Sequence, residues 1–424
     1  MKRILLLMSA SLVISAATAA TYYVSPTGND NNAGTSVAPV KTILKGVSKA
    51  TAAGDIVSLA DGDYEIGSQI KITKAISIQG NVADCSKVVV NCKGTQHALY
   101  NDSVDGWSVS GVTFTNVNRA VYSKKAITVS HCAFRQTKDN ATLGGAALCF
   151  PAGSESGLKL VEDCVFEDLF GAGTSSKGAV YLDATFPITF RRCVFCNCTA
   201  GNNGGAIGQN GNGGIVLTAE NCEFRNCQGV AGGAVFLQSN SGKTATFRNC
   251  LFAGNTSNSG ASDGGSAVYT KSAAMYENCT FADNNCPKSA GSNSAAVRNN
   301  GGASTLVNCV FWNNTKKADA QGVTESSVVS SSYTATNCAA PTAAALTGDT
   351  NIALSASPFA AEGAYTLAQK IGEADNPCID GGVKLDWMTE LATDLAGVAR
   401  INGEKPDIGA YEYSAAVGFL MLID

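Results

Sequence analysis

Apolar residues along this chain fall in short segments, and the segments repeat at a nearly constant interval. The signature Cys-x-Phe occurs seven times with successive Cys spacings of 28 to 32 residues, and Cys338 follows 29 residues after the last. A repeat this regular predicts stacked copies of one structural unit. The seven copies are Cys132/Phe134, Cys164/Phe166, Cys193/Phe195, Cys222/Phe224, Cys250/Phe252, Cys279/Phe281 and Cys309/Phe311.

The residue before each of these Cys predicts a corner between two strands. Ala245 and Phe247 share one face before Asn249, whereas Cys250 and Phe252 share a face after it. If both pairs point inward, one residue must turn the chain between them. Asn and Asp tolerate a positive φ best among non-Gly residues, and they fill most of these positions. The eight positions are His131, Asp163, Arg192, Asn221, Asn249, Asn278, Asn308 and Asn337.

A third strand is marked by small residues in each unit. The markers are Gly145-Ala146-Ala147, Gly178-Ala179-Val180, Gly205-Ala206-Ile207, Gly233-Ala234-Val235, Ser266-Ala267-Val268 and Ala295-Ala296-Val297. Segments this short, punctuated by Gly, Asn and Ser, oppose a helical repeat. One coil cannot bury its own apolar face, but coils stacked about 4.8 Å apart do so. The pattern predicts an all-β fold, a single-stranded right-handed parallel β-helix with three short strands per coil.

Stacking makes ladders of like residues inside this rod. Cys and Phe ladders are expected in the core, and a further ladder follows at a turn: Cys198, Cys227, Asn255, Asn284 and Asn314. Stacked Asn amides can hydrogen-bond from coil to coil. The in-phase Cys are interpreted as small buried hydrophobes, because parallel Cβ vectors suit a disulfide poorly. Disulfides remain the alternative, and Cys198 with Cys227 is the pair that most favours one.

The first residues predict export. Lys2 and Arg3 precede an apolar run too short to span a bilayer, and Ala17-Thr18-Ala19 forms a cleavage pattern, so residues 1–19 are expected to be a signal peptide. Their removal takes two positive charges from a net charge of −4 and leaves −6. Such mild acidity gives no reason to expect nucleic acid as a partner. No later stretch predicts a transmembrane helix, so the mature chain is expected outside the cell or on its outer surface.

The rest of the chain divides into four parts. We expect an N-terminal strand and cap over residues 20–55, with a short helix within 39–54, and β-helix coils over 56–345. Residues 346–413 are expected to hold C-terminal coils and a closing module. Residues 414–424 form an apolar tail whose role the sequence leaves open.

Three groups of motifs resemble known families. Gly204-Gly205-Ala206-Ile207, Gly232-Gly233-Ala234-Val235 and Phe252-Ala-Gly-Asn255 resemble the GGA[I/V/L] and FxxN marks of polymorphic outer membrane protein repeats. The opening from Tyr22 to Tyr64 resembles that of pectate-lyase-like β-helix proteins. The motifs around Pro377-Cys378, Asp394-Leu395 and Asp407-Ile408 are similar to the terminal module of choice-of-anchor bacterial surface proteins. The resemblance covers most of residues 21–413 and implies the fold and an exported, surface-attached protein, but not an activity.

The strand after the small-residue marker is the predicted ligand-binding face. With Ala147, Val180 and their counterparts inward, the outward positions begin at Leu148 and Phe150 and bring aromatic side chains beside amides and charges. A sugar ring has an apolar face and radiating hydroxyls that such side chains can hold. The alternative is that these side chains only stabilise the sheet. The candidate glycan-binding residues are Tyr181, Asp183, Asn210, Phe236, Gln238, Tyr269, Lys271, Arg298 and Asn300.

Catalysis is less well supported by the sequence. His97 and His131 have no evident partner, so no metal site or catalytic triad is predicted. Lyases of the pectate-lyase-like class generally pair a basic residue with acidic Ca²⁺ ligands, but Asp183 and Lys271 are separated by roughly 14 Å on stacked coils. The sequence therefore favours adhesion or polysaccharide binding, to a cell-surface or host glycan, with no catalysis and no cofactor. The alternative is a polysaccharide lyase, with Ca²⁺, or a glycoside hydrolase that acts on an acidic glycan.

A scaffold role rests on a different stripe. Apolar residues facing outward on the Cys strand would suit a protein partner or loop packing. They are Ala133, Val165, Val194, Leu251 and Val310.

Overall fold

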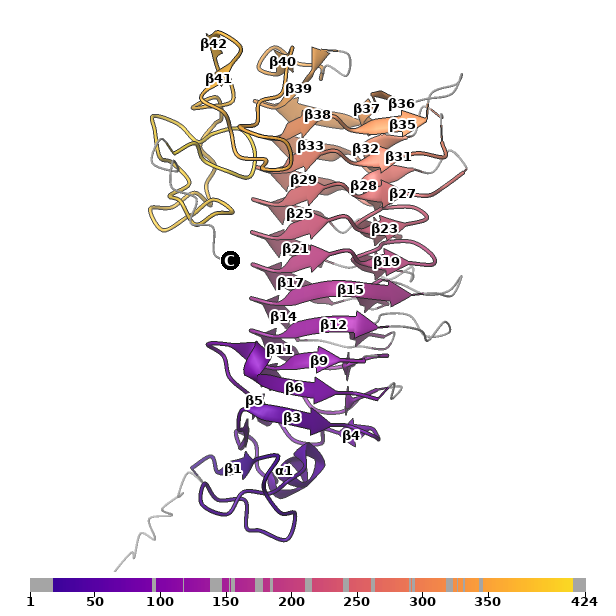
Figure 1. Cartoon of the computed structure of the whole chain (residues 1–424). Helices are drawn as coiled ribbons and strands as arrows, with labels where there is room; N and C mark the ends of the chain where they lie inside the picture. The colour runs from indigo at the N-terminus through magenta and orange to yellow at the C-terminus, as the bar shows by residue number, and fades with distance from the viewer. Residues whose placement is uncertain are drawn as a thin grey trace, which may run out of the picture.

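The computed structural model is an elongated rod of stacked β-coils (Figure 1). It describes residues 18–93, 97–116, 118–137, 147–151, 153, 157–171, 178–183, 186–209, 216–238, 244–260, 264–289, 291, 294–317, 323–325, 327–330, 332–342 and 346–414. The helical elements with described bounds are α1 (Ile43–Lys49) and the 3₁₀ turn η1 (Cys85–Lys87). No described helix is long and apolar enough to cross a membrane. The predicted right-handed parallel β-helix is confirmed.

Each coil contributes one strand to each of three parallel sheets along the rod. The first sheet has twelve strands: β1 (Thr21–Val24), β2 (Ile56–Leu59), β5 (Ser77–Gln79), β8 (Trp107–Ser110), β11 (Ile127–Ser130), β14 (Lys159–Glu162), β17 (Pro187–Arg191), β21 (Val216–Glu220), β25 (Ala245–Arg248), β29 (Ala274–Glu277), β33 (Ser304–Val307) and β38 (Tyr333–Thr336). The second has ten: β4 (Ile70–Lys71), β7 (Leu99–Asn101), β10 (Val121–Ser123), β13 (Leu148–Phe150), β16 (Val180–Leu182), β20 (Ile207–Gln209), β24 (Val235–Leu237), β28 (Gly265–Thr270), β32 (Ala295–Asn299) and β37 (Ser327–Ser330).

The third sheet carries the Cys-x-Phe strands. It contains β3 (Gly62–Glu65), β6 (Val88–Asn91), β9 (Thr113–Thr115), β12 (Ala133–Thr137), β15 (Val165–Gly171), β18 (Val194–Cys196), β22 (Glu223–Arg225), β26 (Leu251–Ala253), β30 (Thr280–Ala282), β34 (Val310–Trp312), β39 (Ala339–Pro341) and β40 (Ile352–Leu354). From the end of β15 onwards the coils add a fourth, very short strand: β19 (Thr199–Ala200), β23 (Gln228–Gly229), β27 (Thr256–Ser257), β31 (Asn285–Cys286) and β35 (Thr315–Lys317), with β36 (Val323–Glu325) antiparallel to the last. A separate hairpin joins β41 (Lys370–Ile371) and β42 (Ala374–Asp375).

The predicted corner lies between the first and third sheets. All eight residues that precede the repeated Cys have φ between 48° and 53°, and this left-handed turn lets the side chains on both flanking strands point inward. At Asn249, for example, Phe247 before the corner and Phe252 after it are both fully buried. The switch of the apolar positions from one alternation to the other at this residue therefore predicted the corner correctly.

Inside the rod the Phe residues form a continuous stack. The rings from Phe114 to Phe311 follow one another at centroid distances of 4.5 to 5.3 Å, with nearly parallel planes. Each ring buried in this way contributes about 1.5–3 kcal/mol relative to an exposed ring. The Phe ladder is thus a main element of the core.

The Asn ladder is also present and is fully buried. The Nδ2 of Asn255 donates to Oδ1 of Asn284 at 2.9 Å, and the Nδ2 of Asn284 donates to Oδ1 of Asn314 at 2.8 Å. Each amide also donates to a backbone carbonyl, such as that of Phe252 at 2.9 Å from Asn284. Since the amides satisfy one another and the turn backbone, the polar row is compatible with a buried position.

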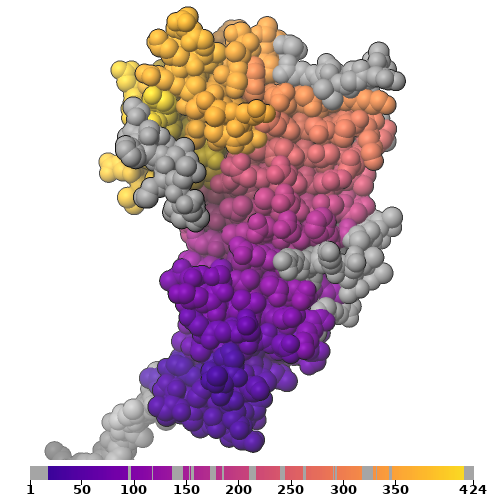
Figure 2. Space-filling model, in the orientation of Figure 1, coloured from indigo at the N-terminus to yellow at the C-terminus, as the bar shows by residue number. Residues whose placement is uncertain are grey.

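The C-terminal segment, residues 376–413, lies along the side of the rod (Figures 1 and 2). We had expected it to form a module that closes the end of the rod. The contact is made by the corner asparagines, whose Nδ2 atoms donate to backbone carbonyls of residues 381–407 at 2.7 to 3.2 Å. The five bonds are Asn221 to Asp394, Asn249 to Thr393, Asn278 to Asp407, Asn308 to Val383 and Asn337 to Gly381. The earlier corners His131, Asp163 and Arg192 contact each other, as Arg192 does with Asp163 at 2.6 Å.

Part of the predicted apolar stripe lies beneath this segment. Leu251 packs with Tyr365 and Tyr411, and Val310 packs with Ile408. Of the two roles that we considered for the stripe, loop packing therefore applies to these two residues.

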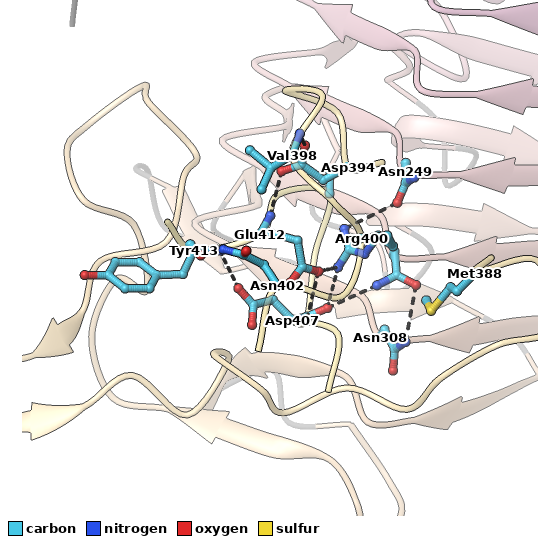
Figure 3. Close-up of polar contacts among 12 residues, drawn as sticks. Asn249, Asn308, Met388, Asp394, Val398, Arg400, Asn402, Asp407, Glu412 and Tyr413 are labelled. Atoms are coloured by element: carbon cyan, nitrogen blue, oxygen red, sulfur yellow. Dashed lines mark hydrogen bonds and ion pairs between the residues drawn. The ribbon is translucent and has the colours of Figure 1, made fainter. Parts of the chain in front are cut away.

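An ion pair holds the segment together beside Asn249 (Figure 3). Arg400 and Glu412 are fully buried, with Nη2 and Oε1 2.6 Å apart, and Arg400 also donates to the Asp407 carbonyl at 2.7 Å. Asp394 accepts backbone N–H groups from Val398 and Glu412. Burial raises the pKa of Glu412 to about 8, although the nearby guanidinium opposes this shift.

We expect Arg400→Met to destabilise the C-terminal segment by about 3–5 kcal/mol, because it removes the buried partner of the Glu412 carboxyl group and the donor to the Asp407 carbonyl. Glu412→Gln should cost less, since burial already favours a neutral side chain at this position. Hydrogen exchange of amides in residues 376–413 measures the effect, with amides of the Phe ladder strands as internal reference. Equal losses in the two variants would contradict the interpretation.

All sixteen cysteines are free, including Cys198 and Cys227, the pair that we had named as most open to a disulfide among otherwise free thiols. Their Sγ atoms donate to the carbonyls of Phe166 and Phe195 at 3.4 and 3.6 Å, in the same inward direction. Stacked thiols whose Cβ vectors are parallel have poor geometry for a disulfide bond.

Thiol titration tests this arrangement. In the native protein we expect a thiol-specific reagent to label only Cys85 and Cys196, the two that are not buried, and all sixteen after denaturation without reductant. Mass spectrometry of the labelled peptides identifies the sites. Fewer than sixteen reactive thiols in the denatured, unreduced protein would mean that disulfides form.

Candidate functional site

An outward-facing column of side chains runs along the second sheet. The parallel register places one residue of each coil beside its counterpart in the next, about 4.8 Å away. In order the column is Lys71, Tyr100, Tyr122, Cys149, Tyr181, Gly208, Phe236, Tyr269, Arg298 and Ser330. It contains five aromatic side chains, and three of them belong to the predicted face.

The phase that we predicted for the coil at residues 147–150 was wrong by one residue. Leu148 pairs with Val180 and is fully buried, so it points inward, and Cys149 takes the outward position beside Tyr181. The small-residue marker of this coil has a second Ala, and Ala147 is equivalent to Ala179 rather than to Val180. Leu148 and Phe150 therefore belong to the core.

The C-terminal half of the column is covered. Phe236 and Tyr269 stack at 4.9 Å but are only 4% and 3% exposed, because Ala231 packs on them. Arg298 is buried and donates to Ser330 at 3.2 Å, and the exposed Asn300 donates to the Tyr269 hydroxyl at 2.8 Å. A sugar ring therefore has no access to these aromatic faces, and the prediction of an open face was wrong here.

Two further predicted residues, Gln238 and Lys271, are half-buried next to this covered part, and Asn210 lies outside the described residues. Tyr181 and Asp183 remain accessible. They are half-buried, and the Tyr181 hydroxyl donates to Oδ2 of Asp183 at 3.0 Å. Of the nine predicted residues, this pair is the part of the site that the structure brings together on an open face.

The N-terminal half of the column extends this open face with two tyrosines that sequence reasoning missed. Tyr100 and Tyr122 stack at 4.8 Å with planes only 12° apart, and both are half-buried. Tyr181 follows two coils further along. A signal was available, because Ala98-Leu99-Tyr100 and Ala120-Val121-Tyr122 have the same pattern as the marker at Tyr181.

Polar groups surround the edge of this tyrosine platform. Asp102 accepts hydrogen bonds at 3.2 Å from the Lys71 ammonium and from the Tyr100 hydroxyl. Burial works to raise the pKa of Asp102, but these two donors outweigh it and lower the pKa below its usual value. Burial, followed by the Asp102 carboxylate, raises the pKa of Tyr100. The platform thus presents neutral phenols beside a fixed carboxylate and an ammonium group.

His97, for which the sequence suggested no partner, packs against the platform. Its ring centroid lies 4.6 Å from that of Tyr122 and 5.6 Å from that of Tyr100. Its Nδ1 is buried without a hydrogen-bond partner. Burial, assisted by the positive charge of Arg119, lowers the pKa of His97 to about 4, so the ring is neutral at pH 7.

No group of three or more His, Cys, Asp or Glu residues suited to a metal ion occurs in the described part of the chain. Asp102 and Asp183 occupy equivalent positions three coils apart, roughly 14 Å, which is too far for both to ligate one ion.

A polar cleft of about 290 Å³ lies on another side of the rod, under the C-terminal segment. Arg191, Arg248 and Glu220 line it together with Trp387. Each of these charged groups is already paired: Glu220 with Arg191 at 3.3 Å, and Arg248 with Glu277. The charges in this cleft are therefore largely neutralised by ion pairs between neighbouring coils.

Comparison with known families gives one match, to residues 26–147, described as a protein of unknown function (DUF1565). The matched segment includes Lys71, Tyr100 and Tyr122 and ends before Tyr181. The comparison with curated proteins gives no match.

Among solved structures, the chain is similar to pectate lyase Pel9A, with 16% identity, coverage of 93% of this chain and 96% of that chain, and a TM-score of 0.57. Matches with TM-scores of 0.38 and 0.35 include a mannuronic acid specific family 6 polysaccharide lyase from human gut microbiota (12% identity, 76% and 81% covered) and a pectin methylesterase from Aspergillus niger (12% identity, 75% and 91% covered). The first similarity shows that the chain has the parallel β-helix fold of the pectate-lyase-like proteins.

Proposed function

We propose that this protein is an exported β-helix, extracellular or attached to the cell surface, that binds a polysaccharide on the platform of Tyr100, Tyr122 and Tyr181, without catalysis. The observation that carries the proposal is the stacked pair Tyr100–Tyr122, two residues that are only half-buried while Asp102 and Lys71 stand at their edge. Such a surface matches a sugar ring, which has an apolar face and hydroxyls around its rim.

The spacing of the platform suits a chain rather than a single sugar. Tyr100 and Tyr181 are three coils apart, so the aromatic surface extends roughly 14 Å along the rod. The similar structure at a TM-score of 0.57 is named a pectate lyase, which supports a polysaccharide as the class of ligand. The apolar run after Lys2 and Arg3 supports export, which would bring the platform to such a ligand.

A polysaccharide lyase or a glycoside hydrolase that acts on an acidic glycan is the second candidate. The observation that favours it is the presence of Lys71 and the neutral His97 at the platform, since a lyase needs a base near the sugar. Against it, Lys71 donates to Asp102, and the two accessible carboxylates are too far apart to share the Ca²⁺ that a lyase of this class would use.

We expect Tyr122→Ala to weaken polysaccharide binding about fivefold, because it removes one of the two stacked aromatic rings. Affinity electrophoresis in gels that contain polygalacturonate, alginate or a neutral glucan measures the effect. Tyr23→Ala is the matched control, because Tyr23 is 38% exposed but lies on β1, away from the platform. Unchanged binding by a folded Tyr122→Ala protein, or an equal loss in the control, would refute the proposal.

Incubation with polygalacturonate or alginate should give no unsaturated uronate absorbance, with or without Ca²⁺, and no new reducing ends. Both assays are run at the protein concentration at which binding saturates. Turnover that depends on Ca²⁺ and is lost in Lys71→Gln would replace the binding proposal by the lyase. Release of reducing ends without absorbance would indicate a hydrolase.

A further inference from the structure

A second cleft, also of about 290 Å³, lies between the third sheet and the loop that enters the C-terminal segment. It is separate from the tyrosine platform, which is on the second sheet. The described residues that line it are Asp283, Trp312, Asn313, Ser357, Phe359, Ala361, Glu362, Gly363 and Tyr365.

Three aromatic residues form the walls of this cleft. Trp312 is the last residue of β34 and is half-buried, next to the inward-pointing Phe311. Phe359 and Tyr365 come from the loop and meet edge to face, with their centroids 5.6 Å apart. Aromatic faces carry negative charge density, so a cavity bounded by several of them attracts a cation.

The charged lining has one sign only. Asp283 and Glu362 are acidic, and none of the described lining residues is basic. The guanidinium of Arg225 lies 5.5 Å from the Tyr365 ring, but it is outside the lining and pairs with Glu223 at 2.5 Å. The cleft therefore has negative charge that its own side chains do not neutralise.

Asp283 is held in a fixed position at one side of the cleft. Its Oδ1 accepts from the Asn313 amide at 2.6 Å, and its Oδ2 accepts from the Tyr365 hydroxyl at 2.8 Å. Two donors leave further lone pairs of a carboxylate unused. Its φ of 57° is the second left-handed turn of the coil, and Asn at this position would keep the same backbone.

Tyr365 itself adopts a left-handed backbone, with φ of 59°. This conformation costs a bulky side chain about 1–3 kcal/mol, so other contacts must offset it. The bond to Asp283 and the packing on Phe359 do so, and they keep the ring at the edge of the cleft.

We propose that this cleft binds an organic cation, an alkylammonium group small enough to lie between Trp312, Phe359 and Tyr365 and to face the Asp283 carboxylate. The aromatic walls would take up the methyl or methylene groups, and the two carboxylates would neutralise the charge. A primary amine, a quaternary ammonium group or the end of a lysine-like side chain has this chemistry. A neutral group of the same shape gains the apolar contact only.

Choline and its uncharged carbon analogue 3,3-dimethylbutan-1-ol test whether binding needs the positive charge as well as the apolar contact. The full-length protein is used in both titrations. We expect choline to change the tryptophan fluorescence saturably and to bind at least tenfold more tightly than the analogue. Isothermal titration calorimetry gives both affinities. Butylamine in a third titration tests whether a primary ammonium is accepted as well as a quaternary one.

The substitution Asp283→Asn keeps the turn and both hydrogen-bond positions but removes the charge, and it should weaken choline binding about tenfold. Asp168→Asn is the matched control. Asp168 occupies the equivalent turn position of an earlier coil, with φ of 54°, and accepts from Asn197 at 3.0 Å as Asp283 does from Asn313. Phe359→Leu should also weaken binding severalfold by removing one aromatic wall.

Three results would overturn the proposal: equal affinities for choline and its neutral analogue, no saturable choline binding, or the same loss in Asp168→Asn as in Asp283→Asn. Polysaccharide binding by the Asp283→Asn protein should be unchanged, so this cleft can fail as a cation site without affecting the tyrosine platform.

Discussion

Register is the constraint on which the structure depends. The strands of the three main sheets are parallel and pair with their counterparts one coil away, so a side chain on one coil lies beside the equivalent side chain of the next at about 4.8 Å. In the coils from Asp163 to Asn313 the corner residue and the residue five positions later both have positive φ, and the chain changes direction there without disturbing this register. Inside, the rule produces the Phe stack and the Asn ladder. Outside, it produces the column that contains Tyr100, Tyr122 and Tyr181.

The corner between the first and third sheets shows how one position can serve two purposes. Its backbone requires a residue that tolerates the left-handed conformation, which Asn does at low cost. From Asn221 to Asn337 the same residue also donates its amide to the C-terminal segment. Where no such segment docks, the corner carries His131, Asp163 and Arg192, which pair with each other in contact with solvent. The residue type at the corner therefore follows from what lies outside it.

Much of this architecture was accessible from the sequence because it repeats. Seven copies of Cys-x-Phe define the coil, and the parity change at residues such as Asn249 defines the corner. Single exceptions were not accessible in the same way. The extra Ala before Leu148 shifted the phase of one coil, and only the strand pairing reveals the shift.

The burial of Phe236 and Tyr269 could not be predicted for a different reason. Alternation along a strand indicates whether a side chain faces away from the coil interior, but not whether another part of the chain covers it. Ala231, which packs on these two rings, lies in a loop with no periodic pattern of its own. The contacts between Asn249 and Thr393, or Asp283 and Tyr365, join residues that are distant in sequence, so no local pattern predicts them.

These non-local contacts cover one part of the rod and leave another part open. Towards the C-terminus, described residues of the returning segment cover outward faces of the coils, and the cleft beside Asp283 is one opening that remains between them. Towards the N-terminus the same kind of outward column is open, and there we have proposed that the tyrosines bind an extended ligand. A platform formed by stacked coils suits a repeating polymer, whereas a cleft closed by one loop suits a small group. The two proposed ligand classes thus follow from how much of the rod is covered at each site.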